Sequence, residues 1–255
     1  MFELTRTLRF CPSGDPGAPR DNAHAAWPPP RGLAGVLSLD LTIAGRPDPG
    51  TGVLLNVKDL DAAFAAAALP RFRAAAGAEP AGLLRGVAQA LAPTLPFPLL
   101  RLRLSASASA STELRPADMS RVILRQRFSF SAAHRLQADA LSEEENRTLF
   151  GKCNRPSFHG HNYELEVAAA AAIAPDGRSL EPAALDAAVR TRVIDTLDHR
   201  NLNTDVAAFA TRNPTVEHIA QTCWDLLAGG LPEGAELQEV VVWETDRTSC
   251  AYRGG

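Results

Sequence analysis

Short runs of alternating or clustered apolar residues occur in two similar series along the chain. The first series comprises residues 2–8, 32–43 and 100–104, and the second comprises residues 128–134, 158–167 and 239–243. Such runs predict β-strands, and the proline-, glycine- and aspartate-rich segments between them predict turns. Alanine- and leucine-rich segments within each series predict helices.

The common order of these elements indicates a repeated unit. Each series has a strand, a glycine-containing turn and a helix, and the second follows the first by about 125 residues. A repeat of this length indicates duplicated domains, because solenoid units are shorter. We predict two domains, residues 1–118 and 119–255, joined at residues 113–118. The alternative is that an alanine-rich composition makes two unrelated domains look alike.

Each unit is predicted to contain two β-hairpins with two helices inserted. The expected fold class is therefore α+β, with an antiparallel four-stranded sheet and two helices on one face in each of the tandem domains. The edges of such sheets must be covered or paired, which predicts an assembly of several units.

Three histidines and a cysteine lie close together in the second unit. His159 and His161 are two residues apart, so their side chains project from the same face of a strand. With His134 from an earlier strand they would form a three-nitrogen zinc site with an open fourth position, which is typical of catalytic zinc. Cys153 is either the fourth ligand or a separate acid/base thiol. The alternative is an accidental His-x-His pair.

Composition limits the class of function. Of the 255 residues 45% are hydrophobic, and the net charge of −3 gives no indication of a nucleic-acid or membrane-surface partner. No apolar run approaches the roughly 20 residues of a membrane span, and the first residues do not resemble a secretion signal. The four cysteines have no disulfide-framework spacing, so we expect a cytoplasmic protein. The sequence lacks the glycine-rich fingerprints of ATP and nicotinamide sites.

Five blocks of the second unit resemble, in order, the motifs of the 6-pyruvoyl-tetrahydropterin synthases and the related 6-carboxytetrahydropterin synthases. They are Phe128–Leu136, Cys153–Tyr163, Leu197–Asn203, Pro214–Ala220 and Val241–Thr245, within roughly residues 121–254. The resemblance implies the tunnelling fold (T-fold), in which three subunits close a β-barrel and two barrels stack. Because each chain has two units, a homotrimer would supply the same six units.

The resemblance also implies a substrate and a metal. The family acts on 7,8-dihydroneopterin triphosphate, from which the triphosphate is eliminated while protons shift along the side chain. The carboxy synthases also cleave the side chain and release acetaldehyde. A Zn2+ ion would polarise side-chain oxygens of the substrate as a Lewis acid. Its implied ligands are His134, His159 and His161.

Three residues are implied to move protons. Cys153 matches the catalytic base, and zinc and an imidazole nearby would lower the pKa of its thiol; otherwise it is a small buried apolar residue. Asp198 and His199 match residues that act with this cysteine, whereas the sequence alone favours a polar turn here. Simple strand geometry does not require a hydrogen bond between these two adjacent residues.

Four residues, Glu244, Thr245, Thr215 and Glu217, are expected to bind the substrate. Glu244 ends an apolar strand, and a carboxylate accepts two adjacent N–H donors of a pterin in bidentate fashion; a solvated strand-end charge is the alternative. Thr245 is expected to assist it. Glu217 is either a member of the pterin pocket or an acid that completes a capping box with Pro214 and Thr215 at a helix start. Cys223 and Cys250 are expected to be structural, the first on a helix and the second in the tail.

The first unit lacks these groups. Leu8 stands where the second unit has His134, and Leu33 and Gly35 stand where it has His159 and His161. We therefore expect a degenerate, non-catalytic domain beside a catalytic one.

The product is left open by the sequence. The step from Cys153 to His159 and the run from Glu244 to Asp246 resemble the pyruvoyl synthases, whereas residues 248–254 also resemble the carboxy synthases, which supply queuosine and other deazapurines. Two alternatives remain. One is a zinc-dependent lyase or hydrolase on another purine- or pterin-like molecule, and the other is a non-catalytic zinc-binding scaffold.

Overall fold

The structure is a computed structural model that describes residues 1–19, 24–75 and 77–255. The chain forms two compact units. The first contains residues 1–124 and 171–179, and the second contains residues 125–170 and 180–255. Among the described residues, no helix is long and apolar enough to cross a membrane.

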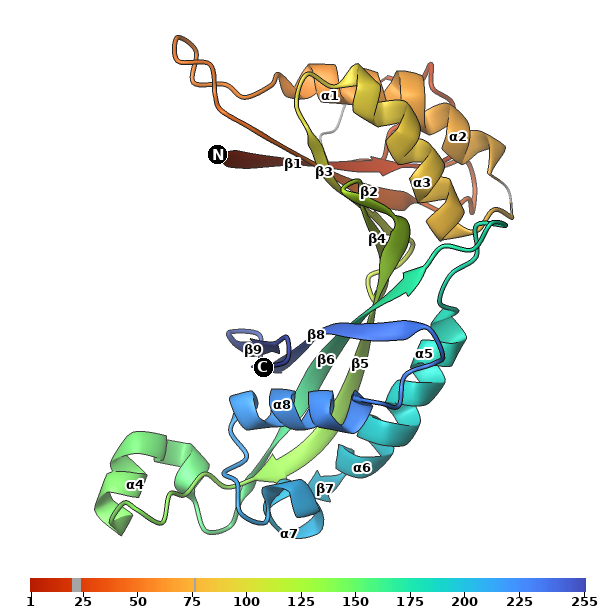
Figure 1. The fold of residues 1–255 in the computed structure, drawn as a ribbon. Helices are drawn as coiled ribbons and strands as arrows, with labels where there is room; N and C mark the ends of the chain where they lie inside the picture. Colours follow the sequence, from red (N-terminus) through yellow and green to blue (C-terminus); the bar gives the residue numbers. More distant parts are fainter. Residues whose placement is uncertain (20–23, 76) are drawn as a thin grey trace. The chain divides into compact units, whose positions relative to one another are not determined.

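The first unit is a four-stranded sheet with helices on one side (Figure 1). Its strands, in spatial order, are β1 (Phe2–Phe10), β2 (Leu37–Gly45), β3 (Leu99–Ser105) and β4 (Ala110–Arg115), each antiparallel to the next. Its helical elements are α1 (Val57–Ala63), η1 (Phe64–Ala68), α2 (Leu69–Ala74), α3 (Pro80–Leu91) and η2 (Ala92–Thr94). Asn56 caps α1 and Pro80 opens α3, both favourable at helix starts.

Three aromatic rings join the sheet and the helices of this unit. Phe10 of β1 lies 5.0 Å from Phe64 and 4.8 Å from Phe72, measured between ring centroids, and all three side chains are buried. Leu39 and Leu41 of β2 complete the apolar layer beneath them. Burial of large apolar side chains is the main stabilising contribution in such a layer.

The structure corrects two details predicted for the first unit. Leu33 and Gly35 precede β2, and Leu33 is fully exposed, so they do not occupy strand positions equivalent to those of His159 and His161. The predicted joint at residues 113–118 is not a linker. Glu113 lies in β4, fully buried and paired with arginines, and a turn leads from β4 directly into the next strand at Asp118.

The second unit is built on β5 (Asp118–His134), β6 (His159–Ala172), β8 (Ala235–Thr245) and β9 (Thr248–Tyr252), in that spatial order; the first residues of β5 and the last of β6 belong to the first unit. The two-residue strand β7 (Arg200–Asn201) pairs in parallel with β5. The helical elements are α4 (Glu143–Phe150), η3 (Gly151–Asn154), α5 (Pro182–Val189), η4 (Arg190–Ile194), α6 (Asp195–Leu197), α7 (Leu202–Asp205), η5 (Ala207–Phe209) and α8 (Val216–Leu227).

Helix α8 packs on β8 and β9 and against η4, so the long helices share one face of this sheet. Its buried side includes Ile219, Cys223 and Leu227. The predicted α+β fold, built from antiparallel strands and helices, is confirmed. Cys223 is fully buried on a helix as expected, whereas Cys250 lies in β9 and not in a tail.

Candidate active site

The three predicted histidines come together where β5 ends and β6 begins. Nε2 of His159 lies 3.2 Å from Nε2 of His134 and 2.9 Å from Nε2 of His161. His134 is the last residue of β5, and His159 and His161 lie two apart at the start of β6, so all three rings project from one face. Tyr163 follows on the same face and stacks on Phe130, with ring centroids 5.0 Å apart.

The arrangement of these nitrogens fits a metal ion. Zinc binds imidazole nitrogens at about 2.0–2.1 Å, so tetrahedral ligands stand roughly 3.3 Å apart. Nδ1 of the buried His134 lies 2.9 Å from the carbonyl oxygen of Pro214. A proton on Nδ1 would donate to this carbonyl, and Nε2 would then present its lone pair to the cluster, as is usual for metal-bound histidine.

The environment of the cluster favours neutral imidazoles. Burial, together with the neighbouring histidines, lowers the pKa of His134 to about 4. Burial also lowers the pKa of His159, with smaller contributions from the charges of His161 and Arg155. Because a metal needs the neutral form of histidine, the chain presents the ligand form at neutral pH.

Cys153 lies beside this cluster on the turn η3. Its sulfur and one ring nitrogen each of His134 and His159 all lie within 4.8 Å of one another. Burial raises the pKa of the Cys153 thiol, and the charge of Glu244 raises it further. The residues of the chain alone therefore favour the neutral thiol, so the lowered pKa expected from the sequence needs a cation nearby.

A set of hydrogen bonds holds the Cys153 turn against the end of β5. The N–H of Leu136 donates to the carbonyl of Cys153 at 2.8 Å, and Nδ2 of Asn154 donates to the carbonyl of Leu136 at 2.8 Å. Nε of Arg135 donates to the carbonyl of Asn154 at 3.1 Å. Sequence reasoning missed Asn154, because its partner is 18 residues away and no local pattern marks it.

Glu244 reaches the cluster from β8. Its Oε1 lies 3.6 Å from Nε2 of His134 and 3.9 Å from Nε2 of His161. The β8–β9 register shifts between Trp243 and Thr245, so Glu244 is the extra residue of a β-bulge, a feature that often re-aims a side chain. Its carboxylate stands where it could either bind a metal or receive a ligand.

The other residues expected to bind substrate have structural contacts. Thr245 is exposed, and its hydroxyl accepts from the N–H of Arg247 within the β8–β9 turn. Thr215 caps α8 by accepting from the N–H of His218 at 3.4 Å. A capping box needs an acid three residues after the cap, but that residue is His218, so the predicted box with Glu217 is wrong. Glu217 is an exposed acid of the first turn.

Asp198 and His199, between α6 and β7, form a pair that contacts β5 at Ser131. Nδ1 of His199 lies 2.8 Å from Oδ2 of Asp198, and Oδ1 of Asp198 accepts from the N–H of Ser131 at 2.8 Å. His199 has a left-handed backbone with φ 56°, which folds its ring back onto its neighbour. Within the described chain no hydrogen bond or ion pair joins this pair to Cys153. His199 lines an open pocket together with residues that include Gly160 and His161.

Known proteins resemble the second half of this chain. The family model of 6-pyruvoyl tetrahydropterin synthase matches residues 123–255. The human 6-pyruvoyl tetrahydrobiopterin synthase is 44% identical over 130 residues, which are 51% of this chain and 89% of that protein. The enzyme of the same name from Dictyostelium discoideum is 41% identical over 138 residues, covering 53% and 99%.

A solved structure agrees with these matches. The 6-pyruvoyl tetrahydropterin synthase of Caenorhabditis elegans has 37% sequence identity and a TM-score of 0.50, and the match covers 53% of this chain and 96% of that one. Residues 1–122 lie outside the family match. The matched segment holds the histidine cluster, the thiol and the bulged glutamate, and through it the chain belongs to the 6-pyruvoyl tetrahydropterin synthase family.

Proposed function

We propose that residues 119–255 form a zinc-dependent lyase that converts 7,8-dihydroneopterin triphosphate to a 6-substituted tetrahydropterin. One observation carries this proposal: His134, His159, His161, Cys153 and Glu244 meet at one place in a segment 44% identical to the human synthase. The spacing of the cysteine and the first histidine favours the pyruvoyl product. The carboxy product, which would lead to queuosine, is the alternative.

The metal would be held by His134, His159 and His161. When bound, a zinc ion supplies a Lewis acid that polarises hydroxyl or carbonyl oxygens of the substrate side chain. The hydrogen bond between His134 and the carbonyl of Pro214 keeps the ligand ring in one orientation. Glu244 would accept the N–H donors of the pterin ring and so fix the side chain over the histidines.

Cys153 would be the base that takes a proton from a side-chain carbon. As that C–H bond breaks, the C–O bond to the phosphate chain breaks too, and triphosphate leaves with the electron pair. The turn that carries Cys153 is tied to the end of β5, which holds the sulfur at a fixed place beside His134 and His159. Fixed placement of a base contributes to rate as much as its pKa does.

Residues 1–118 would form the non-catalytic domain, because the chain up to residue 124 contains one histidine, His24, and no Leu-Asp-His sequence. Three chains would then supply six T-fold units in a homotrimer. In such an assembly Asp198 and His199 of one copy can serve the thiol of another, since no contact joins them within the described chain. A solution mass of a single chain would contradict this arrangement.

The test is mass spectrometry of the products after incubation of the purified protein with 7,8-dihydroneopterin triphosphate, with and without a zinc chelator. We expect a 6-pyruvoyl product that disappears with the chelator and returns with added zinc. His218→Ala, outside the cluster, should retain the activity, and His159→Ala should not. No turnover by a protein with verified zinc would overturn the proposal.

A further inference from the structure

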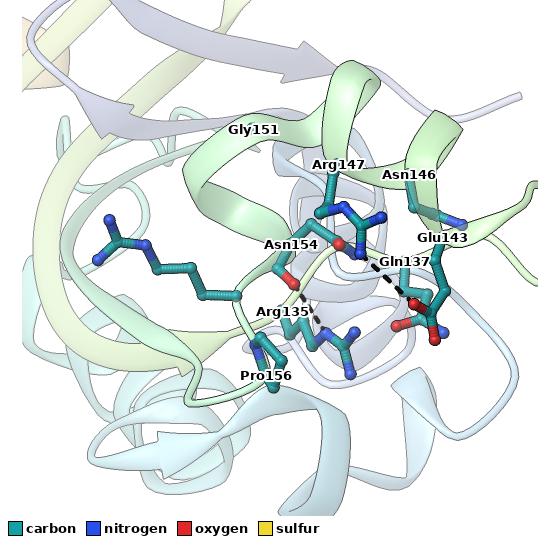
Figure 2. Close-up of a pocket in the computed structure, with 9 residues that line it drawn as sticks. Arg135, Gln137, Glu143, Asn146, Arg147, Gly151, Asn154 and Pro156 are labelled. Carbon is teal, nitrogen blue, oxygen red and sulfur yellow. Dashed lines mark hydrogen bonds and ion pairs between the residues drawn. The ribbon is translucent and has the colours of Figure 1, made fainter.

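A basic pocket lies beside the Cys153 turn in the second unit. It is formed by residues 135–137, by α4 and by residues 151–156, and its charged lining residues are Arg135, Glu143, Arg147 and Arg155. Three positive charges and one negative charge leave the lining with a net charge of +2. Figure 2 shows Arg135, Arg147 and Glu143 around this pocket. Such a lining favours an anion with several oxygens.

Buried side chains fix the walls of this pocket. Asn146 is 2% exposed and donates to the carbonyls of Ala138, Leu141 and Ser142, while its Oδ1 accepts from the N–H of Ala138 at 2.8 Å. Asn154 is 6% exposed and binds the carbonyl of Leu136. A capping box between Ser142 and Glu145 secures the start of α4. The arginines thus extend from a backbone that is already ordered.

The guanidinium groups remain available to a ligand. Arg147 pairs with Glu143 at 3.4 Å, but the two side chains are 64% and 91% exposed, and such a surface pair contributes little. Arg135 uses Nε to hold the carbonyl of Asn154, which orients its other nitrogens. The backbone of Arg155 bonds Lys152 and Phe158, but its guanidinium group makes no hydrogen bond or ion pair with any described residue. Planar guanidinium groups bind phosphate oxygens in bidentate fashion.

The pocket adjoins the proposed chemistry. Arg135 follows His134 directly, Gly151 and Asn154 flank Cys153 on η3, and the charge of Arg155 acts on His159. A ligand in the pocket would therefore lie next to the thiol and the histidines.

We propose that this pocket binds the phosphate chain of the substrate, so that the leaving triphosphate is held by Arg135, Arg147 and Arg155. The proposal rests on the proposed function, because it assigns a site to one part of that substrate. Arg147 lies outside the five blocks that resemble the family, and Arg155 lies within the block Cys153–Tyr163 but has no role in the metal site.

Binding of inorganic triphosphate to the zinc-loaded full chain, measured by calorimetry, tests the pocket without turnover. We expect R147Q/R155Q to bind at least about tenfold more weakly than the unchanged protein. The matched control is R190Q, since Arg190 is 63% exposed and also pairs with an acid four residues earlier, Asp186. The proposal would be overturned if R147Q/R155Q and R190Q weakened triphosphate binding equally, or if the unchanged protein did not bind triphosphate.

A second variant covers the case in which the double variant does not fold. Glu143→Gln removes the negative charge of the pocket and should tighten triphosphate binding several-fold, whereas Glu144→Gln, on the same helical turn but outside the pocket, should not. If Glu143→Gln does not tighten binding, the pocket is not the triphosphate site.

Two further measurements separate this proposal from the proposed function. In R147Q/R155Q the KM for the triphosphate substrate should rise, while the affinity for phosphate-free 7,8-dihydroneopterin should stay the same. If the protein binds triphosphate through these arginines but does not turn over the pterin, the pocket assignment would stand and the proposed function would be rejected. An unchanged KM in an active enzyme would reject the pocket alone.

Discussion

The N–H of Leu136 donates to the carbonyl of Cys153 across 2.8 Å, and this bond ties the turn with the thiol to the strand that ends at His134. Asn154, the next residue after the cysteine, returns a hydrogen bond to the carbonyl of Leu136. Two bonds in opposite directions fix both the position and the orientation of the turn. The thiol is therefore positioned by one backbone bond and one side-chain bond, neither of which depends on a metal.

Asn154→Ala should loosen this turn. The carbonyl of Leu136 would lose a partner, so we expect the free energy of unfolding to fall by about 1–3 kcal/mol and turnover to fall with it. Denaturant unfolding measures the first effect, and the alkylation rate of Cys153, followed by peptide mass spectrometry, should increase. Asn162→Ala is the control, because its exposed side chain bonds no described residue other than Ser131, whose hydroxyl donates to it. An unchanged alkylation rate would show that the other bonds suffice.

Cys153→Ala should retain the metal and the affinity for pterin but lose turnover. The ring nitrogens of the three histidines converge on one point and could hold the metal without the sulfur, which lies beside them. Steady-state kinetics and zinc analysis of the same sample separate the two properties. Cys250→Ala, on β9, should keep full activity. Loss of zinc from the Cys153 variant would instead make the thiol a metal ligand.

His159→Ala should abolish stoichiometric metal binding. His159 is the central ring of the cluster, within 3.2 Å of both other Nε2 atoms, so only two of the three histidine ligands would remain. Elemental analysis after dialysis measures the zinc content. His218 bonds the carbonyl of Asn213 and lies outside the cluster, so His218→Ala is the control. Full zinc occupancy in the first variant would refute the ligand assignment.

Strand periodicity predicted that His159 and His161 share a face, and the resemblance to the family added His134. His159 and His161 share a face because they are two residues apart on a strand, and the structure places His134 opposite them. The positions of functional side chains on irregular backbone were harder to predict. Asp198 and His199 contact each other only because His199 adopts a left-handed conformation, which the sequence does not reveal for a histidine.

Local register explains the other differences. Glu244 points to the histidines from a bulge, whose position depends on pairing with β9. The start of α8 near Thr215 is recognisable from the sequence, but the third residue after this cap is His218, so Glu217 completes no capping box. Leu33 and Gly35 were matched by a constant offset between the two units, and the segment before β2 does not keep that offset.

The metal-free protein should lose stability as the pH falls from about 6.5 to about 4. Burial lowers the pKa of His134 to about 4, whereas the unfolded chain keeps the ordinary value of 6.5. Between these values the unfolded state binds more protons, so protonation favours unfolding, by an amount on the order of 3 kcal/mol. Thermal melts of chelator-treated protein at several pH values measure this loss. His134→Asn should reduce the dependence of the melting temperature on pH. A melting temperature that does not change with pH in the unchanged apoprotein would contradict the prediction.

Glu244→Gln should weaken the binding of 7,8-dihydroneopterin by more than about tenfold, or roughly 1.4 kcal/mol. The change keeps the shape of the side chain but removes the charge that accepts the pterin N–H donors. Because Oε1 also lies 3.6 Å from Nε2 of His134, zinc content must be measured in the same sample. Retained zinc with weakened pterin binding assigns Glu244 to the substrate, whereas loss of zinc assigns it to the metal. Glu233→Gln, an exposed change of equal charge, is the control, and pterin affinity equal to that of this control would remove Glu244 from the site.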